Sequence, residues 1–113
     1  MRNATLLWRL IAVNVHLKRV VDDPMVVPGS DASLLRLLAG FVTDCIHRAH
    51  FELSEEAFDV VEAVLEKDHE GMRGLVRDYF VRDLYRSPHA LESYVWQMGP
   101  LTFAILKAVE TES

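Results

Sequence analysis

Carboxylate and histidine side chains at helical spacing are the residues of this sequence that come nearest to a chemical site. Glu66 and His69 stand three residues apart, the Glu-x-x-His spacing of di-iron helical bundles, and Glu62 lies one turn earlier. A second set follows the spacing i, i+3, i+6: Asp44, His47 and His50. Such side chains hold iron, manganese or zinc when they converge inside a helical bundle.

Convergence of these side chains is not expected. A helix turns by about 100° per residue, so His47 projects roughly opposite the apolar stripe of its helix, and Glu62 and Glu66 project outside theirs. The second Glu-x-x-His that di-iron bundles use is absent from the sequence. Solvated surface charge is the preferred interpretation, and a carboxylate-histidine metalloprotein ranks third among the candidate functions. We expect no metal and no cofactor.

Residues for nucleophilic catalysis are also poorly arranged. Cys45 is the only cysteine and falls on an apolar helical stripe, where a cysteine usually behaves as a small hydrophobic side chain. A single cysteine also allows no internal disulfide and no cysteine-based zinc site. The sequence contains no glycine-rich phosphate loop and no serine in a nucleophile elbow. We therefore predict a protein that is not an enzyme.

Acidic residues concentrate in one segment. Residues 52–70 hold eight acidic side chains and one lysine, a net charge of −7, in a chain whose formal net charge is −5. Like charges one turn apart repel by about a few tenths of a kcal/mol per pair. A surface of one sign attracts an oppositely charged partner, although a simply solvated helix face is the alternative. The predicted binding residues for a basic protein are Glu55, Glu56, Asp59, Glu62 and Glu66.

A second candidate surface combines apolar and arginine side chains. Val81 and Tyr85 stand four residues apart and project away from the main apolar stripe of their helix, beside Arg82. Tyrosine and arginine next to an exposed apolar side chain are typical of an interface hot spot. Burial against the N-terminal segment is the alternative. If exposed, Val81, Arg82 and Tyr85 would bind a partner or a second copy of the chain.

Helices are expected to position all of these residues, because apolar side chains recur every three to four residues. The predicted helices are residues 30–49, 54–71, 72–85, a helix from Ser87-Pro88 to Gly99-Pro100, and 101–109. Ser30 or Asp31, Ser54 and Ser87 are the expected caps, and Gly71 the expected end of the third helix. The last helix is apolar nearly all round and is expected to be the most enclosed.

The N-terminal segment, residues 4–21, has two interpretations. Its long apolar run favours a helix, whereas the alternation of Val13, Val15 and Leu17 with polar residues is the pattern of a strand. With a helix there, the fold class is all-α: a compact single-domain bundle of five or six helices spanning residues 1–113.

Composition and charge indicate the size of the core, the expected localisation and the classes of partner. Half of the 113 residues are hydrophobic, which is enough to build one core without disulfides. No signal peptide and no membrane-spanning segment are recognised, so we expect a cytoplasmic protein that does not bind membranes. The acidic balance also argues against binding to nucleic acid, which requires a basic surface.

The C-terminal third resembles a group of known proteins. Residues 75–84 (LVRDYFVRDL) and 94–101 (YVWQMGPL), with a Gly-Pro break before the last helix, resemble small all-helical bacterial proteins, some of which are immunity proteins of polymorphic toxins. That resemblance implies an inhibitor that meets a basic nuclease toxin.

We therefore expect a non-enzymatic protein-binding module. The most specific hypothesis is an immunity or antitoxin-type inhibitor that occludes a basic partner with its acidic helix. The alternative is a homo-oligomeric assembly or adaptor protein. Under the first hypothesis, Glu62→Lys together with Glu66→Lys should weaken partner binding and leave folding almost intact.

Overall fold

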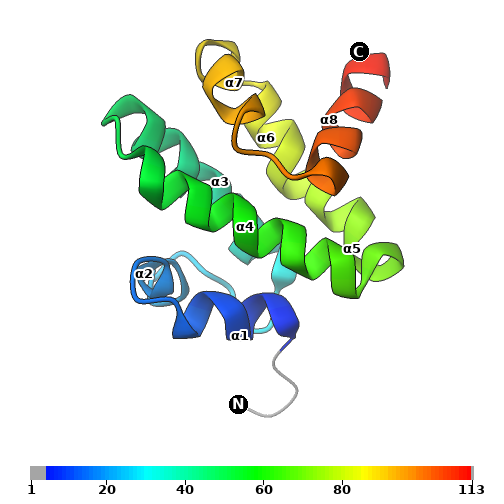
Figure 1. Cartoon of the computed structure of the whole chain (residues 1–113). Coiled ribbons are helices and arrows are strands. Elements are labelled where there is room, and N and C mark those ends of the chain that lie inside the picture. The colour runs from blue at the N-terminus through cyan, green and yellow to red at the C-terminus, as the bar shows by residue number, and fades with distance from the viewer. Residues whose placement is uncertain (1–4, 113) are drawn as a thin grey trace.

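The computed structural model describes residues 5–112, without the side chains of residues 88–91, and every regular element in that part of the chain is helical. The all-α prediction is confirmed. The elements in Figure 1 are α1 (Leu6–Val13), α2 (Lys18–Val21), α3 (Asp31–His47), α4 (Phe51–Lys67), α5 (His69–Val76), the π-helical segment η1 (Arg77–Val81), α6 (Arg82–Tyr85), α7 (Pro88–Val95) and α8 (Pro100–Glu112).

The N-terminal segment is helical and broken in the middle. After α1, the side chain of Asn14 accepts hydrogen bonds from the backbone N–H groups of His16, at 2.9 Å, and Leu17, at 3.1 Å. An asparagine that bonds the backbone two and three residues ahead forms a turn in place of a continuing helix. The alternation around Val15 therefore belongs to this turn, and the strand interpretation is wrong.

The cap of α3 agrees with the sequence, but the start of α4 does not. Ser30 accepts a hydrogen bond from the backbone N–H of Ser33 at 3.1 Å, as an N-cap serine should. In contrast, α4 begins at Phe51, three residues before the predicted cap, after a turn in which Ala49 has a φ of 60°. Ser54 is fully buried inside the helix. A serine near the predicted start of a helix is thus an N-cap only when the helix begins directly after it.

The boundary after α4 was also misplaced. Asp68 ends α4 and caps α5, because its carboxylate accepts a hydrogen bond from the backbone N–H of Gly71 at 3.1 Å. Gly71 therefore lies inside α5 and does not end the preceding helix. The predicted helix 72–85 consists of α5, η1 and α6 joined end to end, and it starts three residues earlier than expected.

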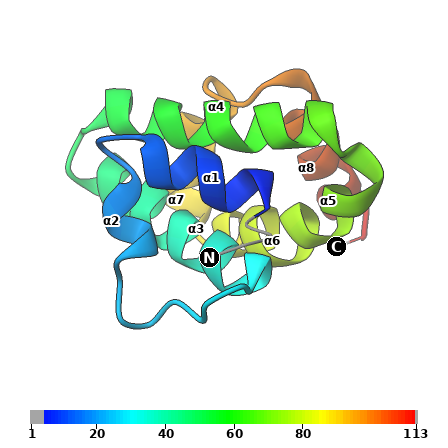
Figure 2. The ribbon, with the colours of Figure 1, turned by 90° about the horizontal axis from the view of Figure 1, so that it is seen from below.

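The core lies where helices from both halves of the chain meet. Figures 1 and 2 show α3 and α4 side by side, with α1 and α2 on one side of this pair and α6, α7 and α8 on the other. The ring of Phe58 in α4 contacts Phe80 in η1 at 5.7 Å and Tyr94 in α7 at 5.9 Å, measured between centroids. Aromatic contacts of this kind stabilise a core beyond the area that they bury.

The last helix is amphipathic, although the sequence predicted one that is enclosed on all sides. Its buried residues share one face: Thr102, Ile105, Leu106 and Val109. Lys107 and Glu110 on the other face are exposed. The buried face packs against α4 and η1, so α8 closes one end of the core and leaves its polar side to solvent.

Candidate functional site

One face of α4 carries a row of exposed carboxylates. At about 100° per residue these side chains fall within one narrow sector of the helix, opposite the buried face that includes Phe58 and Val61. We call them the acidic stripe: Glu52, Glu55, Asp59 and Glu66. Among residues 5–112, none of the four takes part in an ion pair. The stripe therefore offers charge that no cation of the described chain neutralises.

Glu56 lies beside this stripe and is already engaged. Its Oε2 pairs with Nδ1 of His16 at 2.7 Å, and its Oε1 accepts a hydrogen bond from the side-chain amide of Asn14 at 3.3 Å. Both partners belong to the turn between α1 and α2. Glu56 therefore holds this turn against α4, and the predicted binding role applies to it less well than to the acidic stripe.

Glu62 does not lie on the surface, so its predicted role in partner binding is wrong. Only 8% of its surface is exposed. Its Oε2 accepts a hydrogen bond from the backbone N–H of Leu101 at 2.9 Å. Its Oε1 accepts two from Thr102, from the backbone N–H at 3.0 Å and from the hydroxyl at 2.9 Å. A carboxylate at a helix N-terminus satisfies free N–H groups and interacts favourably with the helix dipole.

The approach of Glu62 to α8 explains Gly99. A Cβ atom added at Gly99 would collide with the carboxyl group of Glu62, so only glycine lets the chain pass this close. The sequence pattern missed this contact because it describes the face of one helix and not the neighbour that covers it.

Val81 is also misassigned as a binding residue, because it is fully buried. Val81 lies in η1, which packs against both α3 and α8. Neighbouring helices therefore cover more than one side of η1, including the side that carries Val81. Tyr85 is half-buried and packs against the same core. The hypothesis of an exposed Val81–Tyr85 hot spot is therefore contradicted.

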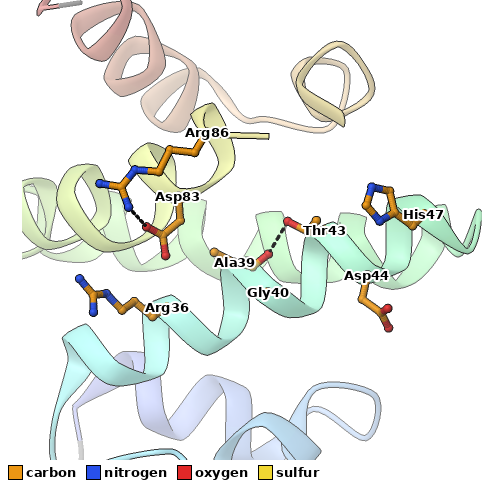
Figure 3. A pocket seen from close by; sticks show the side chains of 8 residues that line it. All are labelled: Arg36, Ala39, Gly40, Thr43, Asp44, His47, Asp83 and Arg86. Atoms are coloured by element: carbon orange, nitrogen blue, oxygen red, sulfur yellow. Dashed lines mark hydrogen bonds and ion pairs between the residues drawn. The ribbon is translucent and has the colours of Figure 1, made fainter. Parts of the chain in front are cut away.

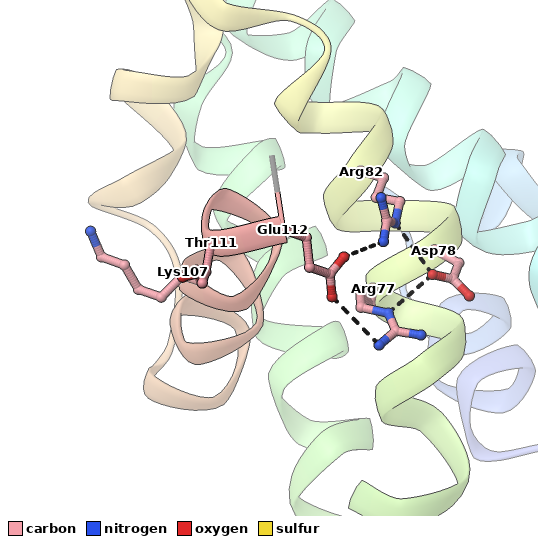
Figure 4. A network of polar contacts seen from close by, with 6 residues as sticks. All are labelled: Arg77, Asp78, Arg82, Lys107, Thr111 and Glu112. Carbon is pink, nitrogen blue, oxygen red and sulfur yellow. Dashed lines mark hydrogen bonds and ion pairs between the residues drawn. The ribbon is translucent and has the colours of Figure 1, made fainter.

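Arg82 belongs to an ion-pair network that ties η1 and α6 to the end of α8 (Figure 4). Its guanidinium donates to Asp78, at 3.4 Å, and to Glu112. Arg77 donates to Asp78 at 3.1 Å. This hydrogen bond from Arg77 is the main reason why the pKa of Asp78 lies below its ordinary value. Arg82 therefore has internal partners, in contrast to the acidic stripe.

Two exposed aromatic side chains form a feature that the sequence analysis missed. Trp96, directly after α7, is 90% exposed, and Phe51, the first residue of α4, is 48% exposed. Large aromatic side chains on a surface are typical of binding sites. A signal was present, because in helical projection Trp96 falls away from the stripe formed by Tyr94, Val95 and Met98, although aromatic side chains at helical spacing more often belong to the core.

The catalytic and metal candidates are dispersed. Cys45 is buried, and burial raises the pKa of its thiol, which disfavours the nucleophilic thiolate. His47 and His50 are exposed. Within residues 5–112 no group of three or more histidine, cysteine, aspartate or glutamate side chains is placed to hold one metal ion.

An open cleft of about 470 Å³ lies between α3 and α6 (Figure 3). Its floor is formed by Ala39, Gly40 and Thr43. Charged groups of both signs line its sides together with His47: Arg36, Asp44, Asp83 and Arg86. Arg86 already pairs with Asp83 at 3.6 Å. The cleft thus presents balanced charge and no convergent set of donors, whereas the acidic stripe presents charge of one sign.

No helix among the described residues is long and apolar enough to cross a membrane. Comparison with known proteins yields no match: no family model, no curated protein and no solved structure is significantly similar to this chain.

Proposed function

We propose that this protein is a non-enzymatic binding module that covers a basic protein partner with the acidic stripe of α4, as an immunity or antitoxin-type inhibitor does. The single observation that carries the proposal is that Glu52, Glu55, Asp59 and Glu66 are exposed on one face without ion-pair partners among the described residues. Asp44, Asp78, Asp83 and Glu110 have basic neighbours within ion-pair distance. Other exposed carboxylates, such as Asp22, also lack an ion pair among the described residues, so what distinguishes the stripe is the alignment of four such carboxylates on one helix face.

Charge arranged in this way favours encounter with a basic surface. A patch of one sign raises the association rate of an oppositely charged protein and disfavours wrong partners. The stripe lies on a helix of 17 residues whose other face is buried, so its position is fixed before binding. Inhibition would then follow from covering the active surface of the partner, which requires no cofactor.

The test replaces the stripe's charge without touching Glu62. Because Glu62 is buried, the substitution Glu62→Lys would disrupt the fold, and the earlier pairing of Glu62→Lys with Glu66→Lys is not a valid test. Asp59→Lys with Glu66→Lys changes two exposed positions of the stripe and places a lysine one turn after Glu55, a favourable helical pair. The control with the same change in charge is Asp22→Lys with Glu110→Lys, at exposed positions at the end of α2 and on α8. It removes one exposed ion pair, Lys107–Glu110, which contributes little to stability.

The measurement is capture of proteins from lysate of the source cell at low salt, followed by elution with salt. The wild type and the control variant should retain the same basic protein and release it when salt is added, whereas Asp59→Lys with Glu66→Lys should not retain it. Retention of that protein by all three proteins would contradict the proposal.

A further inference from the structure

Trp96 is exposed on a turn that hydrogen bonds hold in place. The turn after α7 is closed by a hydrogen bond from the backbone N–H of Gln97 to the carbonyl oxygen of Tyr94, at 2.9 Å. Tyr94 is itself fully buried, and its hydroxyl donates to Thr43 in α3 at 3.1 Å. The indole is therefore presented to solvent by an ordered backbone, which reduces the entropy that binding would cost.

The side chain of Gln97 fastens this turn to the first turn of α4. Its amide NH₂ donates to the carbonyl oxygen of Phe51 at 2.9 Å, and its amide oxygen accepts from the hydroxyl of Ser54 at 2.7 Å. In Figures 1 and 2 the connection between α7 and α8 accordingly passes beside α4. Trp96 and Phe51, which we call the aromatic patch, are thus brought to the same end of α4.

The described charges near the aromatic patch that have no ion-pair partner are negative; Arg48, three residues before Phe51, is paired with Asp44 at 3.2 Å. Glu52 and Glu55 of the acidic stripe follow Phe51 within about one helical turn, and both are exposed. Glu92, also exposed, stands four residues before Trp96 and so lies about one helical turn away along α7. An indole face attracts cations, and tryptophan does so more strongly than the other aromatic residues. Carboxylates beside it would hold the same cation by charge.

We propose that the aromatic patch is the anchor point of the interface and receives a segment of the basic partner in which a lysine or arginine stands beside an apolar side chain. The inference rests on the proposed function and adds the chemistry of the contact. The cation would lie over Trp96 next to the carboxylates, while the apolar neighbour packs against Phe51. Buried tryptophans at the centre of an interface commonly carry much of its binding energy.

A second copy of the chain does not suit this surface. Two copies that met through the aromatic patch would bring Glu52, Glu55 and Glu92 of each copy together, and both chains have a formal net charge of −5. Like charges facing each other across an interface are costly. The charge around the patch therefore selects a basic protein segment.

The experiment uses a defined probe, a fluorescein-labelled peptide of alternating lysine and leucine, and the full-length protein. Anisotropy titrations compare the wild type with Trp96→Ala and with Met25→Ala. Met25 is a matched control because it is 75% exposed and apolar, and it lies in the connection between α2 and α3, on the opposite side of the molecule from α4 in Figure 2. We expect Trp96→Ala to weaken binding at least about tenfold, and Met25→Ala to change it less than about twofold.

A second readout comes from Trp96 itself. The variant Trp8→Phe leaves Trp96 as the only tryptophan of the chain. Its emission should move to the blue when the peptide binds. Relative to a free tryptophan derivative, the free protein should be quenched more by caesium ions and less by iodide, since the neighbouring charges are negative. Thermal unfolding of each variant verifies that it is folded.

The outcomes separate the two proposals. One outcome is that Trp96→Ala and Met25→Ala bind the peptide with equal affinity, whereas the double variant Asp59→Lys with Glu66→Lys does not bind it. That outcome would contradict the role of Trp96 as the anchor and leave the acidic stripe as the binding surface. Binding that depends on Trp96 but not on salt or on the charge substitutions would overturn both. A dimer that sedimentation detects in the wild type and not in Trp96→Ala would show that the patch receives a second copy, which also contradicts the inference.

Discussion

Glu62 shows how one side chain can join two distant parts of the chain. Its three hydrogen bonds reach the first turn of α8, about 40 positions further along, and its position requires glycine at Gly99. Hydrogen bonds to a charged group contribute about 1.5–3 kcal/mol, and unsatisfied buried N–H groups are costly. Glu62 is therefore a residue of the fold and not of the binding surface.

We predict that Glu62→Ala lowers the free energy of unfolding by about 2–3 kcal/mol, because the N–H groups of Leu101 and Thr102 lose their acceptor. Glu66→Gln, one turn further on the exposed side, should change it by less than about 0.5 kcal/mol. Chemical denaturation of both variants measures the difference. Similar midpoints for the two would show that the carboxylate of Glu62 does not hold α8.

At this scale the sequence could identify the acidic stripe but could not separate Glu62 from it. Periodicity places a residue on a helix face, and Glu62 stands at the border between the exposed and buried faces of α4. Whether such a border residue is covered depends on the neighbouring α8. Val81 was misjudged for the same reason, since η1 has neighbours on more than one side.

Among the elements, α3 contains a glycine that the packing does not require. Gly40 lies in the interior of this helix, and a Cβ atom added there would meet nothing within 4 Å. A glycine inside a helix often marks a close crossing of two helices, but the structure shows open space at Gly40. The residue forms part of the floor of the cleft in Figure 3.

We predict that Gly40→Ala raises the free energy of unfolding by about 0.5–1 kcal/mol, because alanine loses less backbone entropy in a helix than glycine. Gly99→Ala is the opposite case, since its Cβ would collide with Glu62, and it should destabilise the protein. Thermal denaturation of the two variants should shift in opposite directions. A loss of stability in Gly40→Ala would mean that the space above α3 is filled in solution.

The network between η1 and α8 predicts a pH dependence. The pKa of Asp78 is lower in the folded protein than in the unfolded chain. The contribution of its charge to stability is therefore complete above the ordinary pKa of aspartate, and it is lost as the pH falls through the lower pKa of the folded state. Asp78→Asn should therefore reduce stability at about pH 7 by less than about 1 kcal/mol, because the pair is exposed.

The difference in the free energy of unfolding between Asp78→Asn and the wild type should become smaller as the pH falls below the ordinary pKa of aspartate. It should also become smaller in high salt. Urea denaturation across this range measures it. A difference that stays constant down to acidic pH would show that the charge of Asp78 is not what the arginines stabilise.

The breaks between elements were harder to predict than the elements. Apolar spacing located each long helix, but the turn at Asn14 and the cap at Asp68 depend on side-chain hydrogen bonds to the backbone that leave no periodic signal. Ser54 shows the reverse error, because a good capping residue was taken as a helix start although the helix begins at Phe51.

On the scale of the whole molecule, the spacing of apolar residues was sufficient to predict an all-α fold, and composition was sufficient to predict one main core. The bundle is compact, with a radius of gyration of 12.9 Å. The aromatic patch could not be predicted from the sequence, because Trp96 and Phe51 are brought to the same end of α4 only by the hydrogen bond from Gln97 and the path of the chain between α7 and α8. The candidate surface thus combines a predictable charge pattern with two exposed aromatic residues that tertiary structure brings to the same end of α4.

The most direct test of the central claim, that the acidic stripe captures a basic protein, is the association rate constant of the purified partner as a function of ionic strength. We expect the rate constant of the wild type to fall steeply as salt is added. Asp59→Lys with Glu66→Lys should associate at least about tenfold more slowly at low salt and depend little on salt. If both proteins associate at the same rate and with the same salt dependence, the acidic stripe does not bind the partner.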